Sequence, residues 1–260
     1  MSDDRTDFTE LYASAYDEMY REKDYEGEVS YLEALWSDLD AAPASVLELG
    51  CGTCGHGLVL AERGYDVLGV DRSAEMVERA REKVAQANQA DSLSVQHGDL
   101  ASFDADEPFD AAIAMFAVMG YVAETDALRE ALETVRRNLS PGGTFIFDTW
   151  YGPAVLDEGP ETRLREIETD TGVLYRYATP TLDTARQVVT VEYDLVHVDE
   201  DDHATVDEEA HEMRFFFQQE MELLTEMTGF DLVGVHPFRD READLGTGTW
   251  NVTWVLEKNA

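Results

Sequence analysis

The spacing of apolar residues divides the first 150 positions into short strands that alternate with helices. "SVLELG" and "DVLGVD" are apolar runs typical of buried strands, and "SAEMVERAREKVAQAN" has the period of a helix, with Ser73 placed as its cap. Further strands are predicted at "LSVQHGD", "FDAAIAMF" and "TFIFDTW", and further helices at "HGLVLAERGY" and "ETDALREALETVRRNL", which "SPGG" ends. This alternation predicts an α/β fold with a parallel sheet and right-handed crossovers.

The pattern changes on either side of this region. Residues 7–40 have helical spacing, so residues 1–40 are predicted to form a helical cap before the break at "AAPAS". Residues 151–217 mostly alternate apolar and polar positions with no helix between them, which predicts an antiparallel β insertion. A helix and two strands follow, so residues 41–150 and 218–260 form the main domain. The insertion is expected to act as a lid or, through its strand edges, as a homodimer interface.

The charge of the chain bears on its partners and its host. It carries 56 acidic against 19 basic residues, a formal net charge of −37, and lysine stands only at positions 23, 83 and 258. Self-repulsion of this size destabilises a compact state in dilute salt, whereas about 1 M salt shortens the Debye length to about 3 Å. We therefore expect a halophilic host. Nucleic acid is excluded as a partner, since no basic stripe is present to neutralise phosphates.

Neither a secretory signal nor a membrane segment is predicted. The first residues, "MSDDRTDFTE", are acidic and polar, and no run of about 18 apolar residues follows. Two cysteines in 260 residues give no disulfide framework. These features predict a cytoplasmic protein with no membrane partner.

The loop after the first strand, "ELGCGTCGHG", has the spacing of a nucleotide-binding turn. Its glycines satisfy G-x-G-x-x-G: Gly50, Gly52 and Gly55. Asp71 ends the second strand, where a carboxylate can accept hydrogen bonds from ribose hydroxyls. Glu48 would repel a pyrophosphate, and Asp99, at the third strand end, can accept from an exocyclic amine. Acids at three successive strand ends favour a cationic adenosine compound over a dinucleotide.

Two other interpretations of this loop are weaker. Cys51 and Cys54 form a C-x-x-C pair, and His56 follows them as in part of a metal site. A zinc site needs a second ligand pair that the chain lacks, and a redox pair would need neither Glu48 nor Asp71. The acidic stretch "VDEDDHATVDEEAHE" contains no calcium-loop pattern, so we expect a solvated acidic loop there and no metal site.

The ordered motifs resemble those of class I S-adenosylmethionine-dependent methyltransferases. The resemblance rests on "VLELGCGTCGHGLVLAERGYDVLGVDRS", "HGDLASF", "FDAAIAMFAVMGYV" and "LSPGGTFIFD", and it covers about residues 10–150 and 210–260. Within that family the chain is most similar to the sugar N,N-dimethyltransferases, through Tyr16, Asp17, Tyr20 and "KDY" near the start, "MFAVMGY", and His211 to Gly229. The resemblance implies a Rossmann-like, mostly parallel, seven-stranded sheet with helices on both faces.

The resemblance also implies roles at matching positions, with S-adenosyl-L-methionine as the cofactor. Glu48, Gly50 and Gly52 would face its methionine part, and Met115 and Phe116 its sulfonium. The adenosine would be held by Asp71, Arg72, Met76, Asp99 and Leu100, and the cap would close the site with Tyr16 and Tyr25. One departure is Cys54, where the family favours glycine.

The expected reaction is methyl transfer to a small-molecule acceptor, at the nitrogen of an amine or amino sugar. Methyl transfer from a sulfonium depends mainly on positioning, and a base frees the lone pair of an amine. Tyr16 and His211 are the predicted catalytic residues, and other possible bases are Tyr20, Tyr121 and His56. Two alternatives stay open: an NAD(P)-dependent oxidoreductase, from the literal G-x-G-x-x-G, and a cofactor-binding protein without catalysis.

Overall fold

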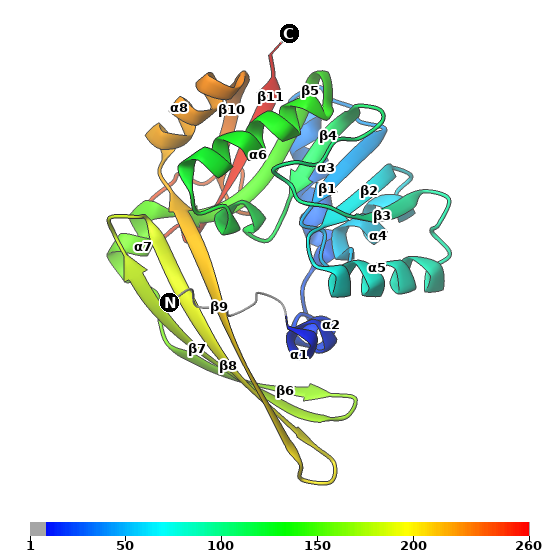
Figure 1. Cartoon of the computed structure of the whole chain (residues 1–260). Coiled ribbons are helices and arrows are strands. Elements are labelled where there is room, and N and C mark those ends of the chain that lie inside the picture. Colours follow the sequence, from blue (N-terminus) through cyan, green and yellow to red (C-terminus); the bar gives the residue numbers. More distant parts are fainter. Residues whose placement is uncertain (1–8, 260) are drawn as a thin grey trace.

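The computed structural model describes residues 9–259, in which the α/β part forms a sheet with the strand order β3-β2-β1-β4-β5-β11-β10 (Figure 1). Strands β1 to β5 run parallel, whereas β11 pairs antiparallel with both β5 and β10. The bounds are β1 Ser45–Leu49, β2 Asp66–Asp71, β3 Leu93–His97, β4 Phe109–Ala114, β5 Leu139–Tyr151, β10 Phe230–Pro237 and β11 Asn251–Lys258. The predicted mostly parallel, seven-stranded α/β fold is confirmed. The first eight residues of the predicted cap lie outside the described part.

Helices cover both faces of this sheet because its strands are apolar on both sides. Val46 and Ile113 point to one face, which α3, α4 and α5 cover, while Leu47 and Phe145 point to the other, which α6 and α8 cover. The bounds are α3 Tyr25–Asp38, α4 Gly55–Glu62, α5 Ala74–Gln86, α6 Thr125–Arg137 and α8 Gln218–Thr228. The predicted cap of α5 is confirmed, since the Ser73 hydroxyl accepts from the backbone N–H of Met76. No helix within residues 9–259 has the length and apolar character of a membrane-spanning segment.

The N-terminal segment is not one continuous helix. It consists of α1 (Glu10–Ser14), α2 (Tyr16–Met19) and the longer α3, with a turn at residues 20–24. We call α1 and α2 the cap. Its apolar side chains Tyr12 and Met19 pack against Met76 of α5 and against Leu174 of the insertion. The cap therefore lies between the sheet and the insertion, as Figure 1 shows.

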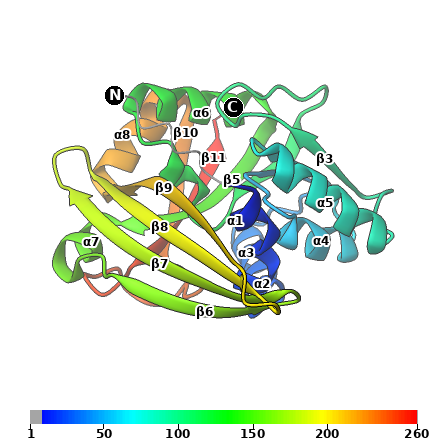
Figure 2. The same ribbon diagram turned by 60° about the horizontal axis from the view of Figure 1, so that its bottom comes forward.

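The insertion is an antiparallel meander that we call the lid, comprising β6 (Arg163–Thr169), β7 (Gly172–Asp183), β8 (Val188–Asp199) and β9 (Ala204–Phe216). It projects from the main sheet and curves past the cap (Figure 2). The end of β9 joins the main sheet, since Trp150 and Tyr151 of β5 pair in parallel with Phe215 and Phe216. This pairing fixes the base of the lid beside the carboxyl end of β5.

Three sequence expectations need correction. A helix that was not predicted, α7 (Gly152–Glu158), opens the insertion, because Pro153 favours a first helical turn. "SPGG" does not stand between a helix and a strand but forms the irregular start of β5, where the pairing with β4 shifts register. The acidic stretch 198–212 is not a solvated loop, because most of it belongs to β9 and Glu209 is fully buried.

Candidate functional site

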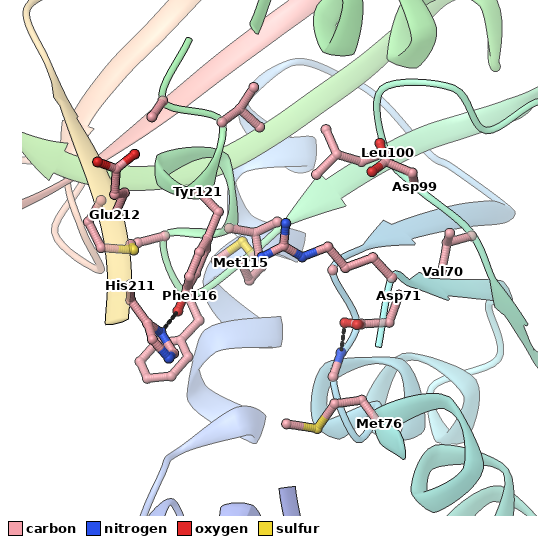
Figure 3. Close-up of a pocket in the computed structure, with 18 of the residues that line it drawn as sticks. Val70, Asp71, Met76, Asp99, Leu100, Met115, Phe116, Tyr121, His211 and Glu212 are labelled. Carbon is pink, nitrogen blue, oxygen red and sulfur yellow. Dashed lines mark hydrogen bonds between the residues drawn. The ribbon is translucent and has the colours of Figure 1, made fainter. Parts of the chain in front are cut away.

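A cavity of about 500 Å³ opens at the carboxyl ends of the parallel strands, between the sheet, the cap and the lid. Figure 3 shows Asp71, Asp99 and Leu100 on one side of it and Tyr121 and His211 on the opposite side. The sequence-predicted residues that the cavity brings together are Tyr16, Gly50, Gly52, Asp71, Arg72, Met76, Asp99, Leu100, Met115, Phe116 and His211. One cavity therefore joins the strand-end acids with the tyrosines and histidine that were considered as bases.

The glycine loop, residues 50–55, contains positive φ angles that residues with a side chain rarely adopt. Gly50 and Gly52 have φ values of 62° and 53°, and a Cβ atom at Gly50 would lie 2.5 Å from Val118. Cys54 also has a positive φ of 61°, which explains why glycine is favoured there. Its thiol is fully buried against Gly69, next to that of Cys51. Cys54 therefore packs beneath the loop and leaves the cavity side open.

Asp71 links the glycine loop to α5. Its Oδ2 accepts from the backbone N–H of Gly52 at 2.8 Å, and its Oδ1 accepts from that of Ser73 at 2.8 Å. Burial raises the pKa of this carboxyl, and the two hydrogen bonds oppose that rise. Asp99, at the next strand end, accepts from Ala101 and so closes its own turn. The two acids are held by backbone groups at the positions predicted for ribose and adenine recognition.

Asp148 is a site residue that sequence reasoning missed. Its Oδ1 accepts from Phe116 N–H at 2.5 Å and its Oδ2 from Ala117 N–H at 3.1 Å, and both of these residues have positive φ values. Burial raises the pKa of Asp148 to about 6, although both hydrogen bonds favour the ionised form. The side chain thus holds the loop after β4, which forms part of the cavity wall. An acid at the end of the fifth strand, in "FIFDTW", was the available signal.

Glu48 and Tyr25 do not line the cavity, in contrast to the expectation from the sequence. The Glu48 side chain points to the face of β1 that α3 and α4 cover. Its Oε1 lies 3.4 Å from Nδ1 of His56. Nε2 of the same imidazole lies 2.7 Å from Glu28 of α3, and the ring of Tyr25 packs edge-on against it. Burial opposes protonation of His56, but the two carboxylates raise its pKa. These contacts of His56 with Glu48, Glu28 and Tyr25 hold the first turn of α4 against β1 and α3.

The opposite wall carries a chain of hydrogen bonds that we call the relay, formed by Tyr121, His211 and Glu209. The Tyr121 hydroxyl lies 2.9 Å from Nδ1 of His211, and Nε2 lies 2.8 Å from Oε2 of Glu209. With an ionised Glu209 and a neutral imidazole, Nε2 donates to the carboxylate and Nδ1 accepts from the Tyr121 hydroxyl. The other oxygen of Glu209 accepts from the backbone N–H of Thr9. Glu209 was not predicted, because its burial depends on contacts distant in sequence.

Aromatic rings also line the cavity between these two walls. Tyr16 lies between Tyr12 and Tyr20, with ring centroids 6.1 and 4.8 Å away, and Tyr193 meets the His211 ring edge-on at 5.0 Å. Burial raises the pKa of Tyr16 well above its ordinary value, and neighbouring tyrosines raise it further. The hydroxyl of Tyr16 therefore stays protonated, so it is a poor base and serves as a neutral wall.

These features fit an S-adenosylmethionine molecule. Loop glycines with no side chain allow close approach of a ligand, and Asp71 offers carboxylate oxygens at a strand end. Val70, Met76, Leu100 and Met115 provide an apolar wall for a planar base and a thioether chain.

Comparisons with known proteins agree with this geometry. Residues 46–143 match the family model described as a methyltransferase domain. Over 150 residues the chain is 29% identical to dTDP-3-amino-3,4,6-trideoxy-alpha-D-glucopyranose N,N-dimethyltransferase of Streptomyces venezuelae, covering 57% of this chain and 61% of that protein. The chain thus spans about 60% of the length of the curated relatives it matches.

Two solved structures share the whole architecture. The sugar N-methyltransferase KedS8 from Streptoalloteichus superimposes with a TM-score of 0.81 at 21% identity, covering 100% of this chain and 97% of that one. CalS10 of Micromonospora echinaspora, an amino pentose methyltransferase solved with S-adenosylmethionine bound, superimposes with a TM-score of 0.72 at 18% identity, covering 98% and 99%. Residues 46–143 therefore match a methyltransferase domain, and the chain as a whole has the fold of these S-adenosylmethionine-dependent methyltransferases.

Proposed function

We propose that the protein transfers a methyl group from S-adenosylmethionine to the amino nitrogen of a small molecule. The observation that carries this proposal is the single cavity with Gly52 and Asp71 on one side and the relay on the other. The relatives named as N,N-dimethyltransferases of dTDP-amino sugars support an amine as the acceptor. An amino sugar is one such acceptor.

The relay can prepare the nucleophile. A protonated amine has no free lone pair, so its proton must leave before methylation. The amine can pass this proton to the oxygen of Tyr121 while the Tyr121 hydroxyl proton moves to Nδ1 of His211. The imidazolium that forms is stabilised by the buried carboxylate of Glu209. S-adenosylmethionine, when bound, supplies the activated methyl group, and the freed lone pair attacks it.

The remaining residues position the reactants. Asp71 and the glycine loop would hold the cofactor at the strand ends, and the loop that Asp148 fixes would place Met115 and Phe116 beside it. Residues of the cap and the lid line the cavity and would limit the access of water to it. Orientation of this kind is the main contribution that a protein makes to transfer from an already activated donor.

Calorimetry with S-adenosylhomocysteine and NADH, in high salt, tests cofactor choice. The proposal predicts saturable binding of S-adenosylhomocysteine and none of NADH. Binding of NADH alone, or of neither ligand to folded protein, would contradict it. Binding without methyl transfer to any amine would instead indicate a cofactor-binding protein without catalysis.

A further inference from the structure

Five aromatic residues line the cavity as one continuous series, which we call the aromatic belt: Phe116, Tyr20, Tyr16, Tyr12 and Tyr193. In this order, successive ring centroids lie 5.0, 4.8, 6.1 and 6.3 Å apart. The belt draws its rings from the loop after β4, the N-terminal segment and the lid strand β8. The side chain of Phe116 is 39% exposed although it is apolar, so part of the belt is open to a ligand.

Both ends of the belt attract positive charge. Nζ of Lys23 lies 4.4 Å from the centroid of the Phe116 ring, and the guanidinium carbon of Arg176 lies 5.1 Å from that of Tyr193. Both distances fall within the range of about 6 Å over which the negative face of an aromatic ring attracts a cation. The rings of the belt therefore already interact with cations of the protein itself.

The tyrosines of the belt stay neutral. Burial raises the pKa values of Tyr12 and Tyr16 well above the ordinary value, and it raises the pKa of Tyr193 to about 12. A neutral ring attracts a cation through its π-electrons and requires no N–H group from it. The belt is therefore suited to a nitrogen that is positively charged and fully alkylated.

The charges around the cavity also favour a cation. Its lining carries four carboxylates: Asp71, Asp99, Glu124 and Glu212. Two arginines oppose them, Arg72 in the lining and Arg186, which pairs with both Glu124 and Glu212, so carboxylates remain in excess within the described lining. In a protein of net charge −37, the surrounding field likewise attracts a cationic ligand and repels an anionic one.

We infer that the aromatic belt binds the alkylated nitrogen of the methyl acceptor as a cation, so that tertiary amines are acceptors and the last product is a quaternary ammonium compound. The inference rests on the proposed function, because it concerns the same cavity and reaction, and it adds how far methylation proceeds. Rings of aromatic side chains are a recurrent way in which proteins hold quaternary ammonium groups, which have no N–H group to donate.

The last methylation balances in atoms and charge. A protonated tertiary nitrogen first gives its proton to the relay. Its lone pair then forms a bond to the methyl carbon as the carbon–sulfur bond breaks, with the electron pair staying on sulfur. The positive charge moves from sulfur to nitrogen, and the quaternary product has no N–H proton to lose. The belt would stabilise this charge at the nitrogen where it develops.

Two probes of the same shape test the binding of a cation. Choline and 3,3-dimethylbutan-1-ol differ in having nitrogen or carbon at the branch point, so only choline is charged. In calorimetry on protein saturated with S-adenosylhomocysteine, choline should bind saturably and about 10-fold more tightly than the neutral alcohol. Equal affinities, or no binding of choline to protein that binds S-adenosylhomocysteine, would overturn the inference and leave the proposed function intact.

Tyr193 is the residue of the belt to change, because it lies outside the relay. Tyr193→Leu should weaken choline binding about 10-fold, whereas Tyr193→Phe keeps the ring and should bind choline like the wild type. Tyr177→Leu, the same substitution at an exposed tyrosine of the lid, is the matched control. These three variants should bind S-adenosylhomocysteine like the wild type. Phe116→Leu, at the other end of the belt, provides the second measurement if Tyr193→Leu does not fold. Unchanged choline binding in folded Tyr193→Leu would overturn the inference and would show that the belt serves only packing.

Analysis of the products tests how far methylation proceeds. Each amine that accepts a methyl group would also be supplied as its N,N-dimethyl derivative, and mass spectrometry would count the methyl groups added. We expect conversion to the quaternary compound, and Tyr193→Leu should lower kcat/KM for this step more than for the first methylation. Methylation that stops at the tertiary amine would overturn the inference. Failure to bind S-adenosylhomocysteine, or to methylate any amine, would contradict the proposed function itself.

Discussion

The hydroxyl of Tyr121 lies 2.9 Å from Nδ1 of His211, and this contact joins the turn after β4 to the lid strand β9. The buried carboxylate of Glu209 binds the other imidazole nitrogen. The base of the proposed reaction is therefore assembled from two separate parts of the chain.

Removal of the Tyr121 hydroxyl tests this assembly. Tyr121→Phe keeps the ring but breaks proton transfer to His211, so kcat should fall about 100-fold, within the usual range for general base catalysis. The affinity for S-adenosylhomocysteine should stay unchanged. Tyr177→Phe, at an exposed tyrosine of the lid, is the control and should behave like the wild type. Equal kcat values for Tyr121→Phe and the wild type would remove the relay from the mechanism.

Asp71 should control cofactor affinity. Asp71→Ala removes both hydrogen bonds to the backbone and the oxygens available to ribose hydroxyls, so S-adenosylhomocysteine should bind about 10- to 100-fold more weakly. Asp91→Ala, at an exposed acid before β3, changes the net charge by the same amount and should have no effect. Calorimetry at one salt concentration compares the two. Similar affinities in both variants would mean that Asp71 does not touch the cofactor.

Asp148 makes a pH-dependent contribution to stability. Its pKa is about 6 in the folded protein against 3.8 for the ordinary side chain, so between these values the folded state holds a proton that the unfolded state does not. This side chain alone therefore lowers the free energy of unfolding as pH rises through that window. The charged neighbours that act on it are Lys23, which lowers its pKa, and Glu28, which raises it.

Asp148→Asn removes this titration. Between about pH 5 and about pH 7.5, the variant should gain about 1.4 kcal/mol in the free energy of unfolding relative to the wild type. Urea denaturation of both proteins at several pH values measures the difference. A difference that does not change with pH would show that Asp148 keeps an ordinary pKa.

Cys54 tests the account of the glycine loop. Cys54→Gly and Cys54→Ala both remove the buried thiol, but only glycine adopts a φ of 61° without strain. The glycine variant should be about 1 kcal/mol more stable than the alanine variant and should bind S-adenosylhomocysteine as well as or better than the wild type. Thermal unfolding and calorimetry check the two expectations. Abolished binding in Cys54→Gly would assign the thiol a direct role.

The acidic composition leads to a prediction about salt. We propose that the formal net charge of −37 is tolerated only when ions screen it. The melting temperature should rise by several degrees between about 0.1 M and about 2 M KCl, because the Debye length shortens from about 10 Å to about 2 Å. A melting temperature independent of KCl concentration would argue against a halophilic host.

The sequence predicted the elements whose formation depends on local pattern. The two-sided apolar strands, the Ser73 cap and the strand-end position of Asp71 follow from spacing and residue type, and the structure has all three. The division of the N-terminal region into separate helices and the formation of α7 were not predicted, since packing against the lid and turn residues decide them.

The parts of the site that depend on long-range contacts could not be derived from the sequence. Glu48 was expected to face the cofactor, but its side chain lies on the face of β1 that is directed toward His56. Glu209 stood in a run of acids that pattern alone assigns to solvent, but β9 brings it under His211. Asp148 was not among the predicted site residues, because its role depends on its hydrogen bond to Phe116, 32 positions away in the sequence.

Methyl transfer to nitrogen is best measured with S-adenosylmethionine that carries a deuterated methyl group. The protein would be incubated in high salt with a panel of amines, amino acids, amino sugars and phenols, followed by mass spectrometry and NMR of the products. We expect deuterated methyl groups bonded to nitrogen, and a loss of this product in Tyr121→Phe. Label on oxygen or carbon, or no label in any acceptor from protein that binds the cofactor, would contradict it.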